Sequence, residues 1–404
     1  METTNDNDTY LLTVNAGSSS IKLAAFSLGN PTKKLFEAAV DNIGHPSVSL
    51  VANGQTKPVA AKDHADAAYV LVQWLTAQAS TSHIVSIGHR IVHGGPGHYK
   101  TQVVTSELLT DLQKFTAFDP VHLPAQLQLI VTFQKLLPDA RQIVCFDTAF
   151  HHDLPTRARL LPIPRHFAAD GIRRYGFHGL SYAFILEELR RVEGEMAVNG
   201  KVIIAHLGSG ASLAAIRNGK SIDTTMSMTP ASGLPMSTRS GDLDPGLALY
   251  LARTQGYDAD QFNRMTNFES GLLGISETTA DMKKLLEIET DDNRAKDAVD
   301  IFCYQVKKSI GSLAAAIGGL DTLVFTGGMG ENAPKIRMRV CEGLEFLGVT
   351  LNTARNEEGT RLISADGSRV GVHVIHTDEA VTIAREAAKL IKTTNDEDKH
   401  ESNV

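Results

Sequence analysis

Residues 10–28, Tyr10-Leu-Leu-Thr-Val-Asn-Ala-Gly-Ser-Ser-Ser-Ile-Lys-Leu-Ala-Ala-Phe-Ser-Leu28, contain two apolar runs separated by a Gly/Ser-rich turn. This order predicts a strand, a tight turn and a second strand. Residues 202–216 repeat it, with the apolar run Val202–Ala205, the turn His206-Leu-Gly-Ser-Gly-Ala-Ser212 and the apolar run Leu213–Ile216. At an offset of 190 residues, Leu23-Ala-Ala aligns with Leu213-Ala-Ala. The repeat is short, but it is what a duplicated domain that opens with a hairpin would leave.

The length of the chain supports two domains, because 404 residues exceed the roughly 250–300 that one hydrophobic core usually serves. Apolar strand-like runs alternate with segments of helical apolar spacing, which predicts an α/β fold. The expected strands include 84–87, 143–146 and 323–326, and the expected helices are 65–78, 123–137, 181–192, 297–317 and 380–391. Gly318-Gly319 would stop the fourth of these helices.

Charge and cysteine content exclude several classes of function. The net charge is −7, which argues against non-specific electrostatic binding to nucleic acid or anionic lipid. The three cysteines form no CxxC pair, so the sequence predicts neither a zinc ribbon nor a disulfide framework, and a cytoplasmic location is the simplest interpretation. The N-terminus has no signal-like pattern, no apolar run approaches the roughly 20 residues of a membrane span, and residues 393–404 are expected to be a solvated tail.

Three Gly-rich segments follow apolar runs, at 15–22, 206–212 and 327–332. Glycine lets successive backbone N–H groups approach an anion, although a tight hairpin explains any single one of these segments. None has the GxxxxGK[ST] or GxGxxG pattern, so P-loop and Rossmann folds are disfavoured. Together they favour a cleft to which each domain contributes a phosphate-binding loop.

Charged side chains stand at the ends of several predicted elements. Arg90 and Arg239 lie in Gly-rich stretches expected to be loops, where a guanidinium could hold carboxylate or phosphate oxygens in a two-pronged fork. Asp147 ends a predicted strand, which is where α/β sheets present ligand groups. Glu379 opens the last predicted helix, where it is equally a Mg²⁺ ligand or a first-turn acid stabilised by the helix dipole.

Histidines could in principle hold a metal, but their spacing does not favour zinc. His89 and His93 are four residues apart in a strand-like segment, so they would not share a face, and His151-His152 would point apart. His178, in a glycine-bounded loop, and His122 are better interpreted as hydrogen-bond donors.

Eight segments together resemble the acetate kinase family of short-chain acyl kinases, in the order that the family has them. They are residues 14–22, 88–95, 146–150, 174–179, 206–212, 238–242, 270–276 and 325–332, and the resemblance runs from the first strand to about Arg385. It implies two similar domains of the actin, hexokinase and Hsp70 type around a nucleotide cleft. The last helix would return to the first domain, giving a discontinuous domain of residues 1–149 and 380–404 and a second domain of residues 150–379.

The same resemblance implies a function. The protein would transfer the γ-phosphoryl group of ATP reversibly to acetate, with Mg²⁺ or Mn²⁺, giving acetyl phosphate and ADP, and it would be a homodimer. Catalytic roles would fall to Arg90, Asp147, His178 and Arg239, and binding of the acid to Arg90, Val92, Val121, His122, Phe177 and Pro230. Asn15 and Glu379 would hold the metal. The nucleotide would be bound by Asn15, Ser18, Ser20, Lys22, His206, Gly208, Ser209, Gly210, Asp281, Met282, Lys283, Gly328, Gly330 and Asn332.

The chain departs from the family pattern at three places. Leu123 stands where the family usually has Asn, Ser209 also replaces an Asn, and Leu180 and Tyr182 replace Thr and His of His-Gly-Thr-Ser-His. The Ser209 change removes an amide that could donate to nucleotide phosphate. The other changes put the local support of His122 and His178 in doubt.

Two alternatives stay open. One keeps the chemistry but uses propionate or butyrate, since one methylene in an apolar pocket is worth only about 1–3 kcal/mol. The other is a non-catalytic nucleotide-binding switch, which would need no arginine for an acid.

Overall fold

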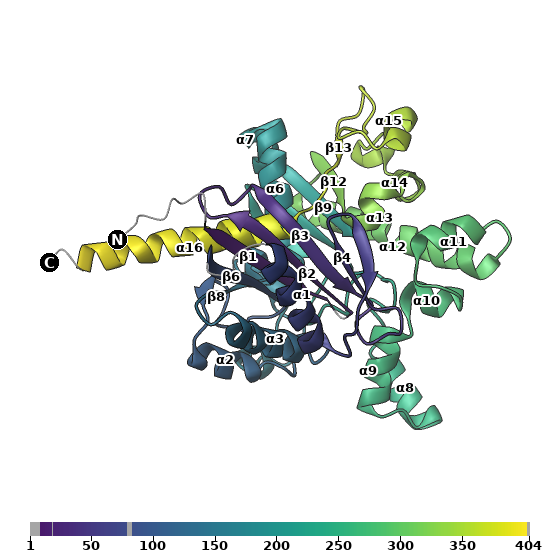
Figure 1. The fold of residues 1–404 in the computed structure, drawn as a ribbon. Helices are drawn as coiled ribbons and strands as arrows, with labels where there is room; N and C mark the ends of the chain where they lie inside the picture. Colours follow the sequence, from purple (N-terminus) through teal and green to yellow (C-terminus); the bar gives the residue numbers. More distant parts are fainter. Residues whose placement is uncertain (1–8, 18, 79–82, 402–404) are drawn as a thin grey trace. The chain divides into compact units, whose positions relative to one another are not determined.

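The computed structural model describes residues 9–17, 19–78 and 83–401 (Figure 1). Ser18 lies outside the described residues. The chain divides into two compact units: unit 1 comprises the described residues of Met1–Ala149 and of Asp378–Val404, and unit 2 comprises Phe150–Thr377.

Unit 1 is built on an eight-stranded sheet of order β5-β4-β3-β2-β1-β6-β8-β7. Its strands are β1 Tyr10–Ala16, β2 Ser20–Ser27, β3 Lys34–Asp41, β4 Ser49–Ala52, β5 Gln55–Pro58, β6 Ile84–Ile91, β7 Gln102–Val103 and β8 Arg141–Phe146. Its helices are α1 His64–Gln78, α2 Ser106–Gln113, α3 Leu123–Leu136 and α16 Glu379–Glu401. A 3-10 turn, Ala149–His151, spans the boundary with unit 2.

Unit 2 has a five-stranded sheet of order β11-β10-β9-β12-β13. The strands are β9 Lys201–Leu207, β10 Ala211–Arg217, β11 Lys220–Thr224, β12 Thr322–Thr326 and β13 Gly371–Val374. The helices are α4 Thr156–Arg159, α5 His166–Ala169, α6 Gly179–Glu193, α7 Glu195–Asn199, α8 Gly246–Gln255, α9 Ala259–Phe268, α10 Gly271–Ser276, α11 Met282–Ile288, α12 Asn293–Ile317, α13 Gly327–Asn332, α14 Pro334–Cys341 and α15 Thr353–Glu358, with a 3-10 turn at Glu345–Leu347.

The two sheets share one topology. In unit 1, β1, β2 and β3 are antiparallel neighbours, while β6 and β8 continue from β1 in parallel. In unit 2, β9, β10 and β11 are antiparallel, while β12 and β13 continue from β9 in parallel. The register pairs Asn15 with Lys22 in one hairpin and His206 with Ser212 in the other. The duplicated hairpin predicted from the sequence is therefore confirmed.

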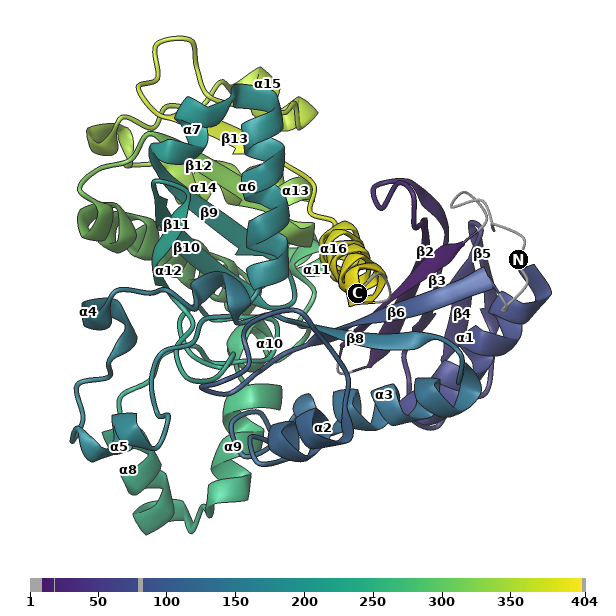
Figure 2. The same ribbon diagram turned by 90° about the vertical axis from the view of Figure 1, so that its left-hand side faces the viewer.

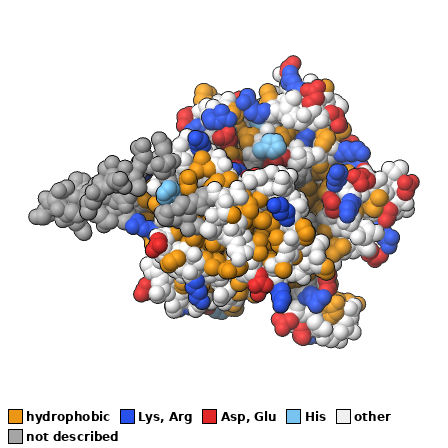
Figure 3. Space-filling model, viewed as in Figure 1, with side chains coloured by type: hydrophobic (Ala, Val, Ile, Leu, Met, Phe, Trp, Pro, Cys, Tyr) orange, Lys and Arg blue, Asp and Glu red, His pale blue; other side chains and the backbone are white. Residues whose placement is uncertain are grey.

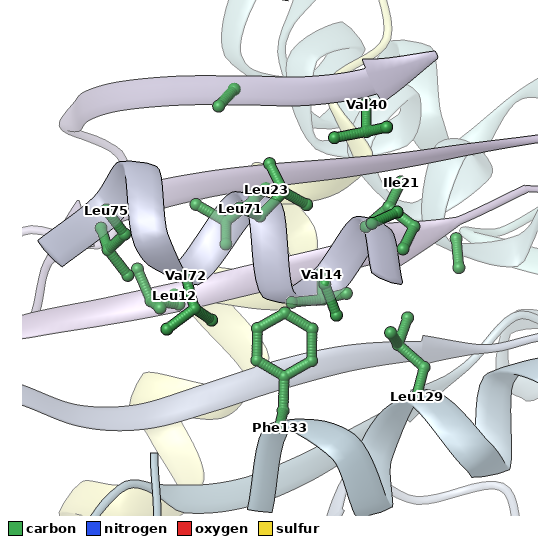
Figure 4. Close-up of a cluster of buried hydrophobic side chains, with 14 of the residues drawn as sticks. Leu12, Val14, Ile21, Leu23, Val40, Leu71, Val72, Leu75, Leu129 and Phe133 are labelled. Carbon is green, nitrogen blue, oxygen red and sulfur yellow. The ribbon is translucent and has the colours of Figure 1, made fainter. Parts of the chain in front are cut away.

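Successive side chains along the strands of unit 1 point to opposite faces of the sheet, and both faces are packed against helices. Leu12 and Val14 of β1 point into a cluster with Leu71 and Leu75 of α1 and Phe133 of α3 (Figure 4). On β6, Gly88 meets α16, since a methyl group placed on it would lie 2.6 Å from Ile383 Cγ2. Figure 2 shows the result, with α1 and α3 on one face of the sheet and α16 on the other.

Three local expectations are wrong. Arg90 was expected in a loop but lies within β6, because the strand runs four residues past the apolar run 84–87. Residues 327–332 were expected to form a Gly-rich loop but form the short helix α13, whose first residue, Gly327, has φ +76°. Helix α16 continues beyond Ile391 to Glu401, so the expected solvated tail is helical over part of its length.

The described surface agrees with the balanced composition. On the face drawn in Figure 3, basic and acidic side chains are interspersed and do not gather into one basic field. Among the described residues, every helix is too short or too polar to cross a membrane.

A buried histidine in β6 makes the stability of unit 1 depend on pH. Burial lowers the pKa of the His89 imidazole to about 4, against the opposing effect of its hydrogen bond to Gln142 Oε1 at 2.7 Å. An unfolded histidine titrates near 6.5, so the unfolded state takes up the extra proton. The free energy of unfolding should therefore fall by about 3 kcal/mol from this group as pH drops from about 6.5 to about 4.

The variant His89→Gln tests this, because its amide can still donate to Gln142 but does not titrate. Relative to wild type, its free energy of unfolding in urea should rise by about 3 kcal/mol between pH 7 and pH 4. His45→Gln, at an exposed histidine of the same unit, is the control and should show no such trend. A pH-independent difference between wild type and His89→Gln would contradict the prediction.

Candidate functional site

Four side chains far apart in the sequence meet at one end of the sheet of unit 1. Arg90 Nη2 donates to Asp147 Oδ2 at 2.7 Å, and Arg90 Nη1 donates to Asn15 Oδ1 at 3.2 Å. Asn15 Nδ2 donates to Glu379 Oε2 at 2.6 Å. These residues come from the ends of the parallel neighbours β1, β6 and β8 and from the start of α16, so the sheet topology itself brings them together.

The electrostatics of this cluster centre on Arg90. Burial alone would lower the pKa of its guanidinium, but the negative charges of Asp147, Glu379 and Asp119 outweigh burial and raise it. Arg90 is therefore a permanent cation. Its Nε atom is buried, has no hydrogen-bond partner among the described residues, and lies 3.9 Å from Glu379 Oε2. A buried cationic donor that the fold leaves unsatisfied is costly, and an anionic ligand would offset that cost.

Asp119 is a member of this site that sequence reasoning missed. It is 2% exposed, and its carboxylate accepts from the backbone N of His122 at 2.9 Å and from His122 Nδ1 at 3.0 Å. A carboxylate can only accept, so it fixes the proton of the His122 ring on Nδ1. The support of His122 that the Leu123 departure put in doubt thus comes from Asp119. The available signal was the spacing, an Asp three residues before the N-cap of α3.

The oxygen donors of this cluster suit a hard divalent cation. Asn15, Asp147 and Glu379 offer one amide and two carboxylate groups. Within the described part of the chain, no three His, Cys, Asp or Glu side chains gather into a metal cage. Mg²⁺ needs no such cage, because it keeps several waters and uses one or two carboxylates. The residues therefore fit the expected ion.

Unit 2 gathers a second group of polar side chains around the turn between β9 and β10. His178 and His206 stack with ring centroids 4.3 Å apart. A methyl group placed on Gly210 would lie 3.1 Å from His178 Nε2 and 3.6 Å from Arg239 Nη1, so both groups face this glycine. Arg239 Nη1 also donates to the carbonyl of Pro230 at 3.2 Å.

Next to this turn, unit 2 contains a cavity of about 870 Å³. Its lining includes seven of the predicted nucleotide-binding residues, Gly208, Ser209, Asp281, Met282, Lys283, Gly328 and Asn332. The volume falls in the range of cofactor and ligand pockets, and residues of the helices α11 and α13 contribute to the lining. Asp281 caps α11, because its carboxylate accepts from the backbone N of Lys283 at 2.9 Å.

Six other predicted nucleotide-binding residues are not among those that line this cavity: Asn15, Ser20, Lys22, His206, Gly210 and Gly330. Gly330 is buried in α13, and its carbonyl accepts from the fully buried Arg337 at 2.9 Å. Ser20 opens β2, and Lys22 is exposed on that strand opposite Asn15. The backbone N–H of Gly327 donates to Glu331 Oε1 at 2.9 Å, so this N–H group already has a partner within the protein.

The predicted pocket for the alkyl group is spread over both units. Val92 and Val121 belong to unit 1, where Gln126 Oε1 accepts from the backbone N of Val92 at 2.8 Å. Phe177 and Pro230 belong to unit 2, and both are buried. The carbonyl of Pro230 accepts from Arg239 Nη1, which links one of these residues to a predicted catalytic group.

Comparison with known proteins relates these two groups of residues to a family. The sequence profile of the acetokinase family matches residues 10–385. This chain belongs to the acetokinase family. A protein named acetate kinase from Rhodopseudomonas palustris (strain TIE-1) is 42% identical over 391 residues, covering 94% of this chain and 98% of that protein. A propionate kinase from Citrobacter rodentium (strain ICC168) is 38% identical, covering 94% and 96%.

The solved structures agree with the family. The crystal structure of a propionate kinase from Francisella tularensis subsp. tularensis SCHU S4 matches with a TM-score of 0.87 at 34% identity, covering 94% of this chain and 98% of that one. The expected α/β fold with two related units is confirmed, as is the family resemblance.

Proposed function

We propose that this protein is an acetate kinase, which transfers the γ-phosphoryl group of ATP reversibly to acetate and gives acetyl phosphate and ADP. The observation that carries the proposal is the arrangement around Arg90. A permanently charged guanidinium is held by Asp147 and Asn15, while its buried Nε has no hydrogen-bond partner among the described residues. A protein that only binds a nucleotide as a switch would not need this anion site in addition to a site for the nucleotide phosphates.

Phosphoryl transfer requires little covalent participation by the protein. One carboxylate oxygen of acetate forms the new bond to phosphorus while the bond from phosphorus to the bridging oxygen of ADP breaks. Acetate is already ionised, so no general base is needed, and catalysis rests on alignment and on neutralising the charge of the phosphoryl oxygens.

In this proposal, unit 1 binds the acid. Arg90 would hold the acetate carboxylate, and Asp147 would keep the guanidinium in place through the 2.7 Å ion pair. His122, whose ring is oriented by Asp119, would line the site of the acid. Asn15, Asp147 and Glu379 would hold Mg²⁺, which when bound supplies positive charge to the nucleotide phosphates.

Unit 2 would bind the nucleotide and the transferring group. The 870 Å³ cavity is large enough for a nucleoside, which favours a nucleotide over a small inorganic phosphoryl donor. Arg239 and His178, which both face Gly210, would donate to the phosphoryl oxygens as negative charge builds up on them.

The main competitor is the same reaction with a longer acid, propionate or butyrate, because relatives named acetate kinase and propionate kinase have similar identities to this chain. We favour acetate because five of the relatives compared, at 38–42% identity, are named acetate kinase. The residues proposed to line the pocket, Val92, Val121, Phe177 and Pro230, are apolar and would suit a short alkyl group.

The test is release of ADP from MgATP with acetate, propionate and butyrate at equal concentrations. The expected result is the highest kcat/KM on acetate. A higher value on a longer acid would keep the mechanism and change the substrate. Binding of nucleotide without turnover on any of the three acids would reject the kinase and favour the switch.

We also propose a homodimer in the cytoplasm, as the family resemblance implied. The three cysteines, Cys145, Cys303 and Cys341, are free and buried, which suits a reducing compartment. Sedimentation equilibrium of the full chain would test the dimer.

A further inference from the structure

Two buried hydroxyl groups lie behind His178 in unit 2. Ser212 Oγ lies 2.8 Å from His178 Nδ1, and the hydroxyl of Tyr182 makes a short hydrogen bond to the same Oγ. Ser212 and Tyr182 are both 0% exposed. Tyr182, Ser212 and His178 therefore form a hydrogen-bonded chain in which the two hydroxyl groups are out of contact with water. Tyr182 stands at one of the positions where this sequence departs from its family pattern.

The number of protons decides the direction of this chain. The recorded partners of Ser212 Oγ are His178 Nδ1 and the Tyr182 hydroxyl, and if both donated to it, its own buried proton would have no acceptor. Ser212 therefore donates to one of these neighbours and accepts from the other. A phenol is more acidic than an aliphatic hydroxyl and is the better donor of the two. Tyr182 therefore donates to Ser212, and Ser212 donates to His178 Nδ1, which must carry a lone pair. The remaining proton of the neutral ring then lies on Nε2.

The proton on Nε2 of His178 points to the turn that Arg239 also faces. His178 Nε2 faces Gly210 on the same side as Arg239 Nη1. His206, stacked on the ring of His178, is held in the same manner, with its Nδ1 2.9 Å from Ser181 Oγ and its Nε2 toward Gly208. The titratable or charged groups that the structure records around the His178 ring include His206, Arg239 and, through Ser212, Tyr182, whose ring also contacts His151.

We propose that Tyr182 is a positioning residue which, through Ser212, fixes His178 as a neutral imidazole with its proton on Nε2. This inference rests on the proposed function for its last step, in which His178 Nε2–H donates to a phosphoryl oxygen beside Arg239. A neutral donor adds no second positive charge next to the guanidinium, and its orientation is set before the substrate arrives. His178 also has φ +59° at the N-cap of α6, so its backbone is fixed in the left-handed region.

The test is Tyr182→Phe, which removes only the hydroxyl from a buried ring. We expect kcat to fall about 10–100-fold, with the KM values for ATP and acetate unchanged, because the group that Tyr182 orients acts in the transition state. In ¹⁵N-histidine NMR of the full chain, wild-type His178 should show the Nε2–H tautomer, and the variant should show a mixture. The His178 signal is assigned with His178→Gln.

Tyr175→Phe is the matched control. Tyr175 is a buried tyrosine of the same unit whose hydroxyl donates to the carbonyl of Gly171 at 2.6 Å, so it loses an equivalent hydrogen bond elsewhere. It should leave kcat and the His178 signal unchanged. Equal loss of kcat in both variants, or a His178 signal in Tyr182→Phe identical to wild type, would overturn the proposal.

Ser212→Ala provides a second variant if Tyr182→Phe does not fold. It should reproduce the tautomer mixture, and the double variant should lose no more activity than Ser212→Ala alone, because both changes break the same chain. A full additive loss in the double variant would overturn the proposal. Failure of wild type to turn over any acid would reject the proposed function, whereas the NMR tautomer tests the Tyr182 chain independently.

Discussion

Arg239→Lys should lower kcat for phosphorylation of acetate by about 10³-fold, with little change in the free energy of unfolding. The lysine keeps the positive charge but loses the planar fork that can span two phosphoryl oxygens. Arg239 Nη1 donates to the carbonyl of Pro230 and to Met236 Sδ. Because Arg239 is only half-buried and a lysine keeps its charge, we expect the fold to tolerate the change. Steady-state kinetics with MgATP and acetate, together with urea unfolding, measure both effects.

Arg264→Lys is the control for this substitution. Arg264 is an exposed arginine of the same unit, in an ion pair with Glu269 on the surface. The control should keep wild-type kcat. Near-wild-type turnover in Arg239→Lys would remove Arg239 from the mechanism.

Asp147→Asn should lower kcat by about 10²-fold or more and should also destabilise unit 1. Asp147 is fully buried and its carboxylate holds Arg90. The neutral amide can accept one hydrogen bond from Arg90 but no longer balances its charge, which should reduce the free energy of unfolding by about 1–3 kcal/mol. Because Asp147 is also a proposed ligand, the Mg²⁺ concentration for half-maximal rate should rise.

Asp139→Asn, an exposed aspartate just before β8, is the matched control and should change none of these quantities. If Asp147→Asn lost stability but kept wild-type kcat and Mg²⁺ dependence, Asp147 would be a structural partner of Arg90 and would have no role in the reaction.

Much of the fold could be predicted from local sequence. The hairpins opening at Tyr10 and Lys201 were visible because adjacent antiparallel strands need only a short turn between them. Helices α1, α3 and α12 begin and end within a few residues of their predicted limits, since apolar spacing and the Gly318 stop are local signals. The prediction was wrong for α13, because its run of glycines is typical of a loop. Hydrogen bonds from Gly327 N to Glu331 and from Arg337 to the carbonyl of Gly330 stabilise it as a helix.

The family, the duplicated α/β topology and the types of residue that a phosphoryl-transfer site needs can all be recognised in the sequence. How these residues meet depends on the tertiary fold. Asn15 and Glu379 are 364 positions apart, yet they share a hydrogen bond because β1 and α16 pack in one unit. Likewise, the roles of Asp119 and Tyr182 follow from a contact with one particular histidine, and a single sequence records the presence of a side chain without recording its partner.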